Sequence, residues 1–447
     1  MNLTDRFIDC IESFINNDDF SEDAIKKCFF DYTGVLISGA YKLKGRHENY
    51  IKHLASSGDA IVAGTSKTTD VYSSALLNAL SAHVLELDDG HRYGMLHPGV
   101  TIFSALLAVC RKDKVKPHDF FRAAAAGYEA TIRLACMVQP EHKKKGFHAS
   151  ATCGTIGAAV AVSVSRNYSR IELKNAISAA TTSASGLLEM IDDDSELKPY
   201  NCAQAAVNGI MAANMAKVGY KGPKDAIGGK RGFICAFNGT INLQKIESAL
   251  VMENCVNSIY RKLYASCRHT HSAVEAALML RTEYDIALND IKEIIVATYD
   301  LAVYGHDNTE VHSISAAKMS TPYSVATALI YGKSGLDAFT EKMLADSLVR
   351  ALTQKVKVIS KSAFTCLVPK IRAAEVTIEL INGDKYKSRV NYPKGEPENP
   401  LSNEEMEKKF TELLTAANME GEYITKLQNS IVELHNNWNT YFELITC

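Results

Sequence analysis

One run of seventeen uncharged residues restricts the fold of this chain more than any other stretch. It extends from Ala149 to Ser165, between His148 and Arg166, and consists mostly of alanine, glycine, serine and threonine. Small residues at helical spacing let the axes of packed helices come close together, which predicts a tight, multi-helix, all-α domain. The run is too weakly apolar to span a bilayer, and charges interleaved in the neighbouring segments argue against packing within a membrane.

Other segments with helical periodicity surround this run within the first 262 residues. Ser21 followed by two acidic residues is typical of a helix N-terminus. The segment from 70 to 110 is expected to form two apolar helices joined by a polar loop. The remaining expected helices are Leu3–Ile15, Ser21–Ser38, Ala123–Met137, Glu172–Met190 and Ala203–Val218.

The sequence pattern changes after about residue 262. Asn382-Gly383 lies between two strand-like segments and is the strongest short-range signal for a β-hairpin. The expected strands are Ile291–Tyr299, Val356–Ser360, Ala374–Leu380 and Lys385–Val390, and the expected helices are Ser313–Tyr331 and Asp337–Leu352. Prolines at 393, 397 and 400 mark a linker, and the helices Glu404–Ala416 and Ile424–Leu444 are expected to follow it.

These patterns predict a mainly α protein with a large all-helical domain and a smaller α+β lid domain. Residues 1–262 and 403–447 are assigned to the helical domain, and residues 263–402 to the lid. A length of 447 residues agrees with two domains, because it exceeds what one compact core usually holds.

Charge and cysteine usage limit the partners and the compartment. The formal net charge is −2, which gives no electrostatic footprint for nucleic acid or for an anionic membrane. The eleven cysteines are scattered without a Cys-x-x-Cys pair, which favours reduced thiols and a cytoplasmic location. Acidic residues stand too close to the N-terminus for a signal peptide.

The loop from His83 to His97 is the first candidate for chemistry. It contains three carboxylates, three imidazoles, an arginine and a tyrosine between two apolar helical segments. Burial and close charges move pKa values toward neutrality, so proton transfer can be built from such a loop. A solvated loop with an ordinary helix cap is the alternative.

Four further groups have a similar character. Each has an ordinary explanation: a helix cap, a surface pair between Lys198 and the acids beside it, a salt bridge at a domain hinge, or a core tyrosine. They are Phe147-His148, Lys198-Pro199, the segment from Tyr264 to His271 that includes Arg268 and His269, and the segment from Ala317 to Tyr323.

A metal site is an alternative for the histidines at 269 and 271. Their i, i+2 spacing places both imidazoles on one face only if the segment is a strand. No carboxylate stands at ligand spacing beside them. We therefore predict no metal site at these histidines.

Taken together, the motifs resemble the MmgE/PrpD family, which includes 2-methylcitrate dehydratase, cis-aconitate decarboxylase and iminodisuccinate epimerase. The resemblance covers nearly the whole chain, in the order and at the spacing of the family. It rests on Glu-Leu-Asp-Asp-Gly (86–90), His-Pro-Gly (97–99), Gly-Phe-His (146–148), Gly-Thr-Ile-Gly (154–157), Leu-Lys-Pro-Tyr-Asn (197–201), Ala-Ala-Val-Asn-Gly (205–209), Tyr-Ala-Ser-Cys-Arg-His-Thr-His (264–271) and Ala-Lys-Met-Ser-Thr-Pro-Tyr (317–323).

The resemblance implies a helical domain with an α+β lid, a homodimer, and cofactor-free chemistry in the cleft between the domains. It implies that the family's active-site groups fall on His97, His148, Lys198, His271 and Tyr323. The acidic position of the first loop falls on Glu86 or Asp88. This chain departs from the pattern there: the dehydratase and decarboxylase branches look like Asp-Phe-Asp-Asp-Thr-Trp, whereas this loop has Gly90-His91 and then Arg92-Tyr93.

The resemblance further implies a small di- or tricarboxylate substrate, and hence a carbanion or enolate-like charge beside a carboxylate. Lys198, Arg268 and Arg92 would hold carboxylates, and Glu86 and His269 complete the predicted substrate-binding set. His97 and His148 are the candidate bases, Asp88 would orient a histidine, and Tyr323 would donate a proton. His271 would enter the cleft only when the lid is closed.

Two reaction classes remain open from the sequence. The first is a cofactor-independent lyase, either a dehydratase or a decarboxylase. The second is an epimerase or isomerase that removes a proton and returns it on the other face. A binding protein without catalytic activity is the third and weakest alternative.

Overall fold

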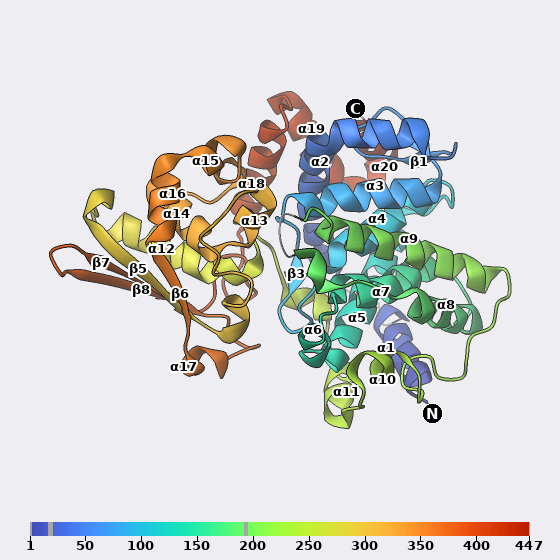
Figure 1. Ribbon diagram of the computed structural model, residues 1–447. Helices are drawn as coiled ribbons and strands as arrows, with labels where there is room; N and C mark the ends of the chain where they lie inside the picture. Colours follow the sequence, from blue (N-terminus) through green and yellow to red (C-terminus); the bar gives the residue numbers. More distant parts are fainter. Residues whose placement is uncertain (1, 17–20, 192–194, 447) are drawn as a thin grey trace.

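The computed structural model describes residues 2–16, 21–191 and 195–446 (Figure 1). The predicted small-residue run forms helix α7 (Ala149–Ser165), whose residues are all buried. Helices α4 (Pro98–Cys110), α5 (Pro117–Val138) and α9 (Lys198–Lys217) pack around α7. Helices α1 (Leu3–Asn16), α2 (Glu22–His53), α3 (Val71–Val84) and α8 (Arg170–Ser183) complete the main helical part.

Close approach between α5 and α7 confirms the role expected for the small residues. A Cβ atom at Gly157 would overlap the hydroxyl of Thr131 and would lie 2.9 Å from the carbonyl oxygen of Gly127. Gly127 meets α7 in the same way, because its Cβ would lie 3.1 Å from the carbonyl oxygen of Gly157. The two helices therefore pack backbone against backbone at this point.

Two predicted helix ends were wrong. Helix α2 continues to His53 instead of ending at Ser38, with Leu43 and His47 as the buried residues of its polar second half. Gly39 does not stop the helix but fits it against α3, because a side chain there would overlap the carbonyl oxygen of Ser81. Helix α8 ends at Ser183 rather than at Met190, and Gly186 follows with a φ of 135°.

The sheet of the second part has four strands in the order β6-β5-β7-β8. Strand β5 (Ile291–Thr298) runs parallel to β6 (Val356–Ser360) and antiparallel to β7 (Ala374–Leu380), which forms the predicted hairpin with β8 (Lys385–Val390). Helices α12 (His271–Glu283), α14 (Thr321–Tyr331) and α16 (Ser347–Gln354) pack on this sheet with a shared apolar core (Figure 1).

Two long helices predicted in this part are each interrupted. Residues 313–331 form α13 (Ile314–Met319) and α14, and the hydroxyl of Ser320 accepts a hydrogen bond from the backbone nitrogen of Tyr323 at the break. The predicted helix 337–352 is likewise divided into α15 (Glu341–Ala345) and α16, with Asp346 as the capping residue. Serine and aspartate side chains favour such starts because they satisfy exposed backbone donors.

The chain then returns to the helical part, where residues 421–445 form two helices that meet at Glu433 instead of the single helix expected over 424–444. Helices α18 (Asn403–Ala416), α19 (Gly421–Val432) and α20 (Leu434–Ile445) lie beside α2 (Figure 1). The fold class is thus confirmed as mainly α with a small mixed sheet. The domain boundaries at 262/263 and 402/403 stay a prediction. The short elements are β1 (Ala60–Ile61), β2 (Thr68–Thr69), β3 (Gly90–His91), β4 (Ile259–Tyr260), α6 (Glu141–Lys144), α10 (Phe233–Asn238), α11 (Leu243–Leu250) and α17 (Ser362–Thr365).

Membrane insertion finds no support in the helices. Within the described residues, none is long and apolar enough to cross a bilayer.

We expect Gly157→Ala to lower the free energy of unfolding by about 1–3 kcal/mol, because the added methyl group overpacks the contact between α5 and α7. Gly45→Ala is the matched control, since a Cβ there meets no atom within 4 Å in α2. It should be neutral or stabilising by up to about 1 kcal/mol, as expected for alanine in a helix. Urea unfolding of both variants measures the difference, and equal stabilities would contradict the packing argument.

Candidate active site

Several helix starts meet where the two parts of the molecule join. His97 immediately precedes α4, His148 immediately precedes α7, and Lys198 is the first residue of α9. Pro98 and Pro199 stand in the first turn of their helices, where proline fits because its missing N–H has no helical partner to lose. Helix N-termini carry unsatisfied N–H groups and partial positive charge, so this region favours bound anions.

In the loop between α3 and α4, the buried carboxylate of Asp88 contacts two histidines. An Asp88 oxygen lies 2.8 Å from Nδ1 of His83 and 3.3 Å from Nδ1 of His97. Burial alone would lower the pKa of His83, but the Asp88 carboxylate raises it to about 10. The pKa of Asp88 is held below its ordinary value, because the nearby cations outweigh the effect of burial. His83 and Asp88 therefore form a charged pair at neutral pH.

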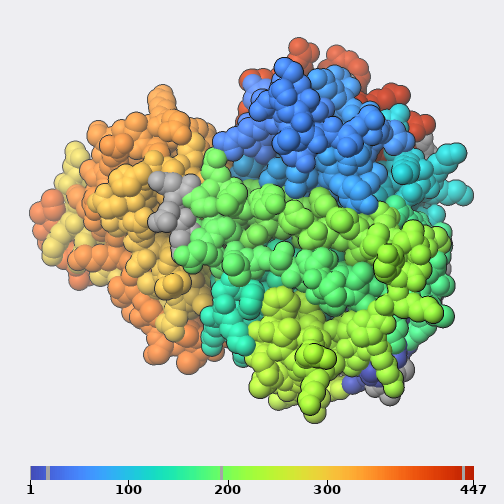
Figure 2. Space-filling model, turned by 45° about the vertical axis from the view of Figure 1, so that its right-hand side comes forward, coloured from blue at the N-terminus to red at the C-terminus, as the bar shows by residue number. Residues whose placement is uncertain are grey.

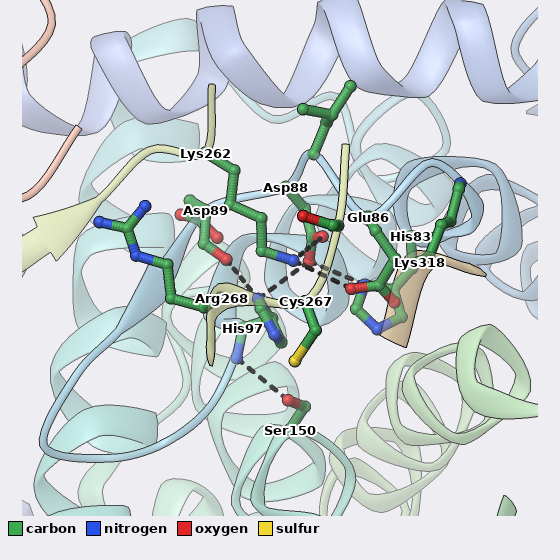
Figure 3. A network of polar contacts seen from close by, with 12 residues as sticks. His83, Glu86, Asp88, Asp89, His97, Ser150, Lys262, Cys267, Arg268 and Lys318 are labelled. Atoms are coloured by element: carbon green, nitrogen blue, oxygen red, sulfur yellow. Dashed lines mark hydrogen bonds and ion pairs between the residues drawn. The ribbon is translucent and has the colours of Figure 1, made fainter. Parts of the chain in front are cut away.

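Glu86 joins three segments of the chain through two lysines. Its carboxylate pairs with Lys198 at the start of α9, and its other oxygen lies 3.0 Å from Nζ of the fully buried Lys262 (Figure 3). Burial would raise the pKa of Glu86, but the two lysines hold it well below its usual range. The sequence alternative, in which Lys198 pairs with acids beside it, falls partly on residues 192–194, which lie outside the described residues.

His97 has the geometry of a neutral base. Its Nδ1 lies 2.6 Å from the carbonyl oxygen of Asp89, and a carbonyl oxygen only accepts, so Nδ1 carries the proton. Nε2 consequently keeps its lone pair, and no described residue bonds to it. Burial lowers the pKa of His97 to about 3, so the ring is neutral at physiological pH.

His148 is the second imidazole of this group. Burial, followed by the charge of Lys198, keeps its pKa well below the ordinary value. Its Nδ1 is buried and has no hydrogen-bond partner within the described part of the chain. A neutral His148 ring near Lys198 could exchange a proton with a ligand bound beside that lysine.

Arg92 and Arg268 are held by acidic residues of the chain. Both guanidinium groups contact the buried Glu396, at 3.0 Å and 2.8 Å, and Arg92 also pairs with Glu398. Arg268 further donates to Nδ1 of His271 at 2.8 Å, while Nε2 of that ring lies 3.2 Å from the carbonyl oxygen of Ser266. Both nitrogens of His271 are therefore engaged by the protein.

Tyr323 and His269 are also engaged elsewhere. The hydroxyl of Tyr323 donates to the carbonyl oxygen of Ala338 at 2.8 Å, and its ring lines a separate cavity beside Arg350. His269 contacts the hydroxyl of Tyr299 at 2.7 Å and Nζ of Lys143 at 3.0 Å. The structure thus brings Glu86, Asp88, His97, His148 and Lys198 together, and places Arg92, Arg268, His269, His271 and Tyr323 in neighbouring contacts of their own.

These contacts also bear on the metal alternative. The lone pairs that a metal would need on His269 and His271 face Lys143 and Arg268, respectively. Among the described residues there is no cluster of three or more histidine, cysteine or acidic side chains arranged to hold a metal ion.

The structure explains why this chain has Gly90 where the family pattern has a threonine. A Cβ atom at this position would overlap the hydroxyl end of Tyr260, which pairs with Gly90 across the short ladder of β3 and β4. The phenol ring of Tyr260 therefore fills the space where the family pattern has a threonine side chain. Glycine is required here by close approach and not by backbone conformation.

Sequence reasoning missed several polar groups of the site. Lys262 stands 176 positions from Glu86, and no local pattern links the two. Cys267 and Lys318 lie within the motifs at 264–271 and 317–323, but their spacing does not indicate a function for either residue. Cys267 has Sγ 3.8 Å from Nε2 of His306. Figure 3 shows Lys262, Lys318 and Cys267 around Glu86, Asp88 and His97.

A cavity of about 400 Å³ opens beside this network. Its walls come from α2, α3, α9 and α13, and it lies within the size range of small-molecule sites. The charged residues of the lining are Lys42, Arg46, Glu86, Glu196, Lys198, Lys318 and Glu341.

Comparisons with known proteins give the family. The MmgE/PrpD N-terminal domain matches residues 15–245, and the MmgE/PrpD C-terminal domain matches residues 264–433. The chain therefore belongs to the MmgE/PrpD family, which confirms the resemblance seen in its motifs.

The named relatives are lyases. A cis-aconitate decarboxylase-like protein of Aspergillus oryzae is 28% identical over 404 residues, which covers 85% of this chain and 83% of the relative. The human cis-aconitate decarboxylase is 25% identical over 351 residues, with 75% and 71% covered. The 2-methylcitrate dehydratase of Salmonella typhimurium is 25% identical over 240 residues, with 51% and 49% covered.

We expect Asp88→Asn to discharge His83 at pH 8. The pKa of His83 is about 10 in the intact pair, and burial should bring it below its ordinary 6.5 once the carboxylate is gone. Because the folded pKa is raised, the stability contributed by the protonation of His83 is complete below about pH 6.5 and is lost as the pH rises through about 10. The imidazole nitrogen shifts of His83, followed by NMR from pH 6 to 10, measure the change.

Asp113→Asn is the control for this experiment, because Asp113 pairs with Arg166 and not with a histidine. It should leave the titration of His83 unchanged. An unaltered His83 titration in Asp88→Asn would show that the carboxylate does not hold its charge.

Proposed function

We propose that this protein is a cofactor-independent lyase that acts on a small di- or tricarboxylate. The observation that carries the proposal is the meeting of a neutral imidazole, His97, with the cationic start of α9 at Lys198. A lysine can hold a substrate carboxylate while the imidazole takes a proton from the adjacent carbon. The names of the relatives support the same reaction class, dehydration or decarboxylation.

In the proposed dehydration, Nε2 of His97 removes a proton from the carbon next to a carboxylate. Lys198 and the N–H groups at the helix starts stabilise the negative charge that develops there. A bound polyanion raises the pKa of His148, so that this ring takes up a proton and delivers it to the departing hydroxyl group. The products are water and an unsaturated acid.

In the proposed decarboxylation, the bond to one carboxylate breaks and its electron pair stays on the substrate carbon. Carbon dioxide leaves, and a protonated imidazole supplies the proton that the carbon needs. The same groups therefore suit both reactions, and the substrate decides between them. Asp88 acts through the histidines that it contacts and is a positioning residue in this proposal.

The remaining predicted site residues keep narrower proposed roles. We propose that Glu86 sets the position of Lys198, and that Arg92 and Arg268 hold the two parts together through Glu396. Catalytic roles for His271 and Tyr323, and substrate binding by His269, would require these side chains to leave their present partners.

A cytoplasmic location is proposed from the scattered cysteines, which are free throughout the described part of the chain.

Proton NMR in D₂O, with EDTA present, tests the proposed activity. The panel contains 2-methylcitrate, citrate, cis-aconitate and iminodisuccinate-type diacids. New vinyl or methylene signals would support the lyase and name its substrate. Deuterium exchange at an α-carbon without loss of water or carbon dioxide would instead support the epimerase. Activity that appears only with an added divalent metal would overturn cofactor independence.

On the substrate so identified, we expect Lys198→Ala and His148→Ala each to lower kcat by about 10²–10⁴-fold, as for the loss of a group that holds or moves a proton. Lys217→Ala at the other end of α9 is the matched control. Lys217 forms an exposed pair with Glu172, so activity should stay within about twofold. Circular dichroism checks folding, and near-normal turnover of both site variants would refute their assignment.

We also propose that the protein is a homodimer that joins through the exposed face of α9. Tyr200, Met211, Met215 and Val218 are spaced so that they share this face, and they are 42–68% exposed. Figure 2 looks onto the side of the molecule where the chain around residues 200–220 (green) reaches the surface. Such an apolar stripe is typical of a surface that is covered in the assembly.

Light scattering after gel filtration measures the assembly. The wild type should have about twice the chain mass of 48.9 kDa, and the double variant Met211→Glu/Met215→Glu should have the mass of one chain. Met279→Glu on α12 is the control, because Met279 is as exposed as Met211, at 47%, and should remain dimeric. A monomeric wild type would refute the proposal.

A further inference from the structure

Lys318 is a buried cation without a carboxylate partner. Its side chain comes from α13 and is only 4% exposed. One hydrogen bond, of 2.9 Å, runs from Nζ to the carbonyl oxygen of Val84 at the end of α3. A lysine has three donors, and no acidic group of the described residues lies within ion-pair distance of this one.

The neighbouring lysines are paired differently. Glu86 is the carboxylate that acts on the charge of Lys318, but Lys198 and Lys262 already share its two oxygens. Figure 3 shows Lys318 on the Glu86 side of the network, away from Arg268. Burial of a charged ammonium group without a counter-charge is costly, so an anion that binds beside Lys318 would stabilise its charged form.

The cavity beside Lys318 has room for such an anion. Lys318, Lys198 and Glu86 line the same cavity of about 400 Å³. Lys42 of α2 also lines the cavity and adds a further positive charge, while Arg46 is paired with Glu196 at 2.9 Å. Three serine hydroxyls, from Ser195, Ser313 and Ser315, also line the space.

We propose that Lys318, assisted by Lys42, forms a subsite for a second carboxylate of the substrate, separate from the carboxylate held at Lys198. This inference rests on the proposed function, since it assumes a substrate with at least two carboxylates. It assigns the cavity wall formed by α13 and α2 to substrate selection. An acid with a single carboxylate leaves this wall empty.

Binding at this subsite has a consequence for protons. Burial, followed by the charge of Lys42, lowers the pKa of Lys318 to about 7. The other charged groups that act on it are Glu86 from the loop after α3, Lys262 from the segment after β4 and Lys198 from α9, with Glu341 of α15 and His47 of α2 on the same cavity. A bound carboxylate raises this pKa, so Lys318 takes up a proton above pH 7 when the substrate binds.

Isothermal titration calorimetry with unreactive acids tests the proposal. The probes are tricarballylate, glutarate and butyrate, which carry three, two and one carboxylates and lack both a hydroxyl group and a double bond. Titration in HEPES and in Tris at pH 8.0 gives the number of protons taken up, because the two buffers differ in ionisation enthalpy. At pH 8.0 wild type should take up about one proton more per tricarballylate than Lys318→Arg, because any proton that His148 takes up is common to both proteins.

Two variants separate charge from proton uptake. Lys318→Met should weaken tricarballylate and glutarate binding by about 10-fold or more and leave butyrate binding unchanged. Lys318→Arg keeps a permanent charge, so it should bind tricarballylate without the proton uptake that Lys318 contributes in the wild type. Lys44→Met is the control, since Lys44 is exposed on α2 and does not line the cavity.

The outcomes distinguish this inference from the proposed function. If wild type binds the acids but Lys318→Met binds them equally well, or if Lys318→Arg takes up as many protons as wild type, the subsite is refuted and the carboxylate site at Lys198 stands. If wild type binds none of the probes, both proposals fail. Should Lys318→Met not fold, the comparison of wild type with Lys318→Arg still decides.

Discussion

The buried carboxylate of Glu86, shared by Lys198 and Lys262, is the interaction on which the rest of the site depends. It joins the loop after α3, the start of α9 and the segment that follows β4. Removing one member leaves a buried charge without its partner, which typically costs about 3–5 kcal/mol. The position of Lys198, and with it the proposed substrate site, is therefore fixed by an ion pair within the protein.

Close helix packing explains how the imidazoles reach this contact. The small residues of α5 and α7 allow backbone contact at Gly127 and Gly157, so α4, α7 and α9 begin near one another. The helix starts then present His97, His148 and Lys198 to one region. A core with larger side chains would hold these helices apart and separate the proton-transfer groups from the cation.

The sequence was sufficient to predict the local structural features and the loop that contributes Asp88 and His97 to the candidate site. The helical periodicity, the Asn382-Gly383 hairpin and the loop containing Asp88 and His97 are all written in short stretches, and the structure has them. The pair of Glu86 with Lys262 and that of Arg92 with Glu396 join residues far apart in the chain. Nothing local signals such pairs, and the burial of Lys318 arises only when α13 packs beside α3.

Glu86 also has a left-handed backbone, with a φ of +58°, which is uncommon for a residue with a side chain. Glycine would adopt this conformation without strain, but it would leave the ammonium groups of Lys198 and Lys262 without their carboxylate. Any side chain without a carboxylate would break the network in the same way. A replacement at residue 86 must therefore present a carboxylate from a left-handed backbone to keep both lysines paired.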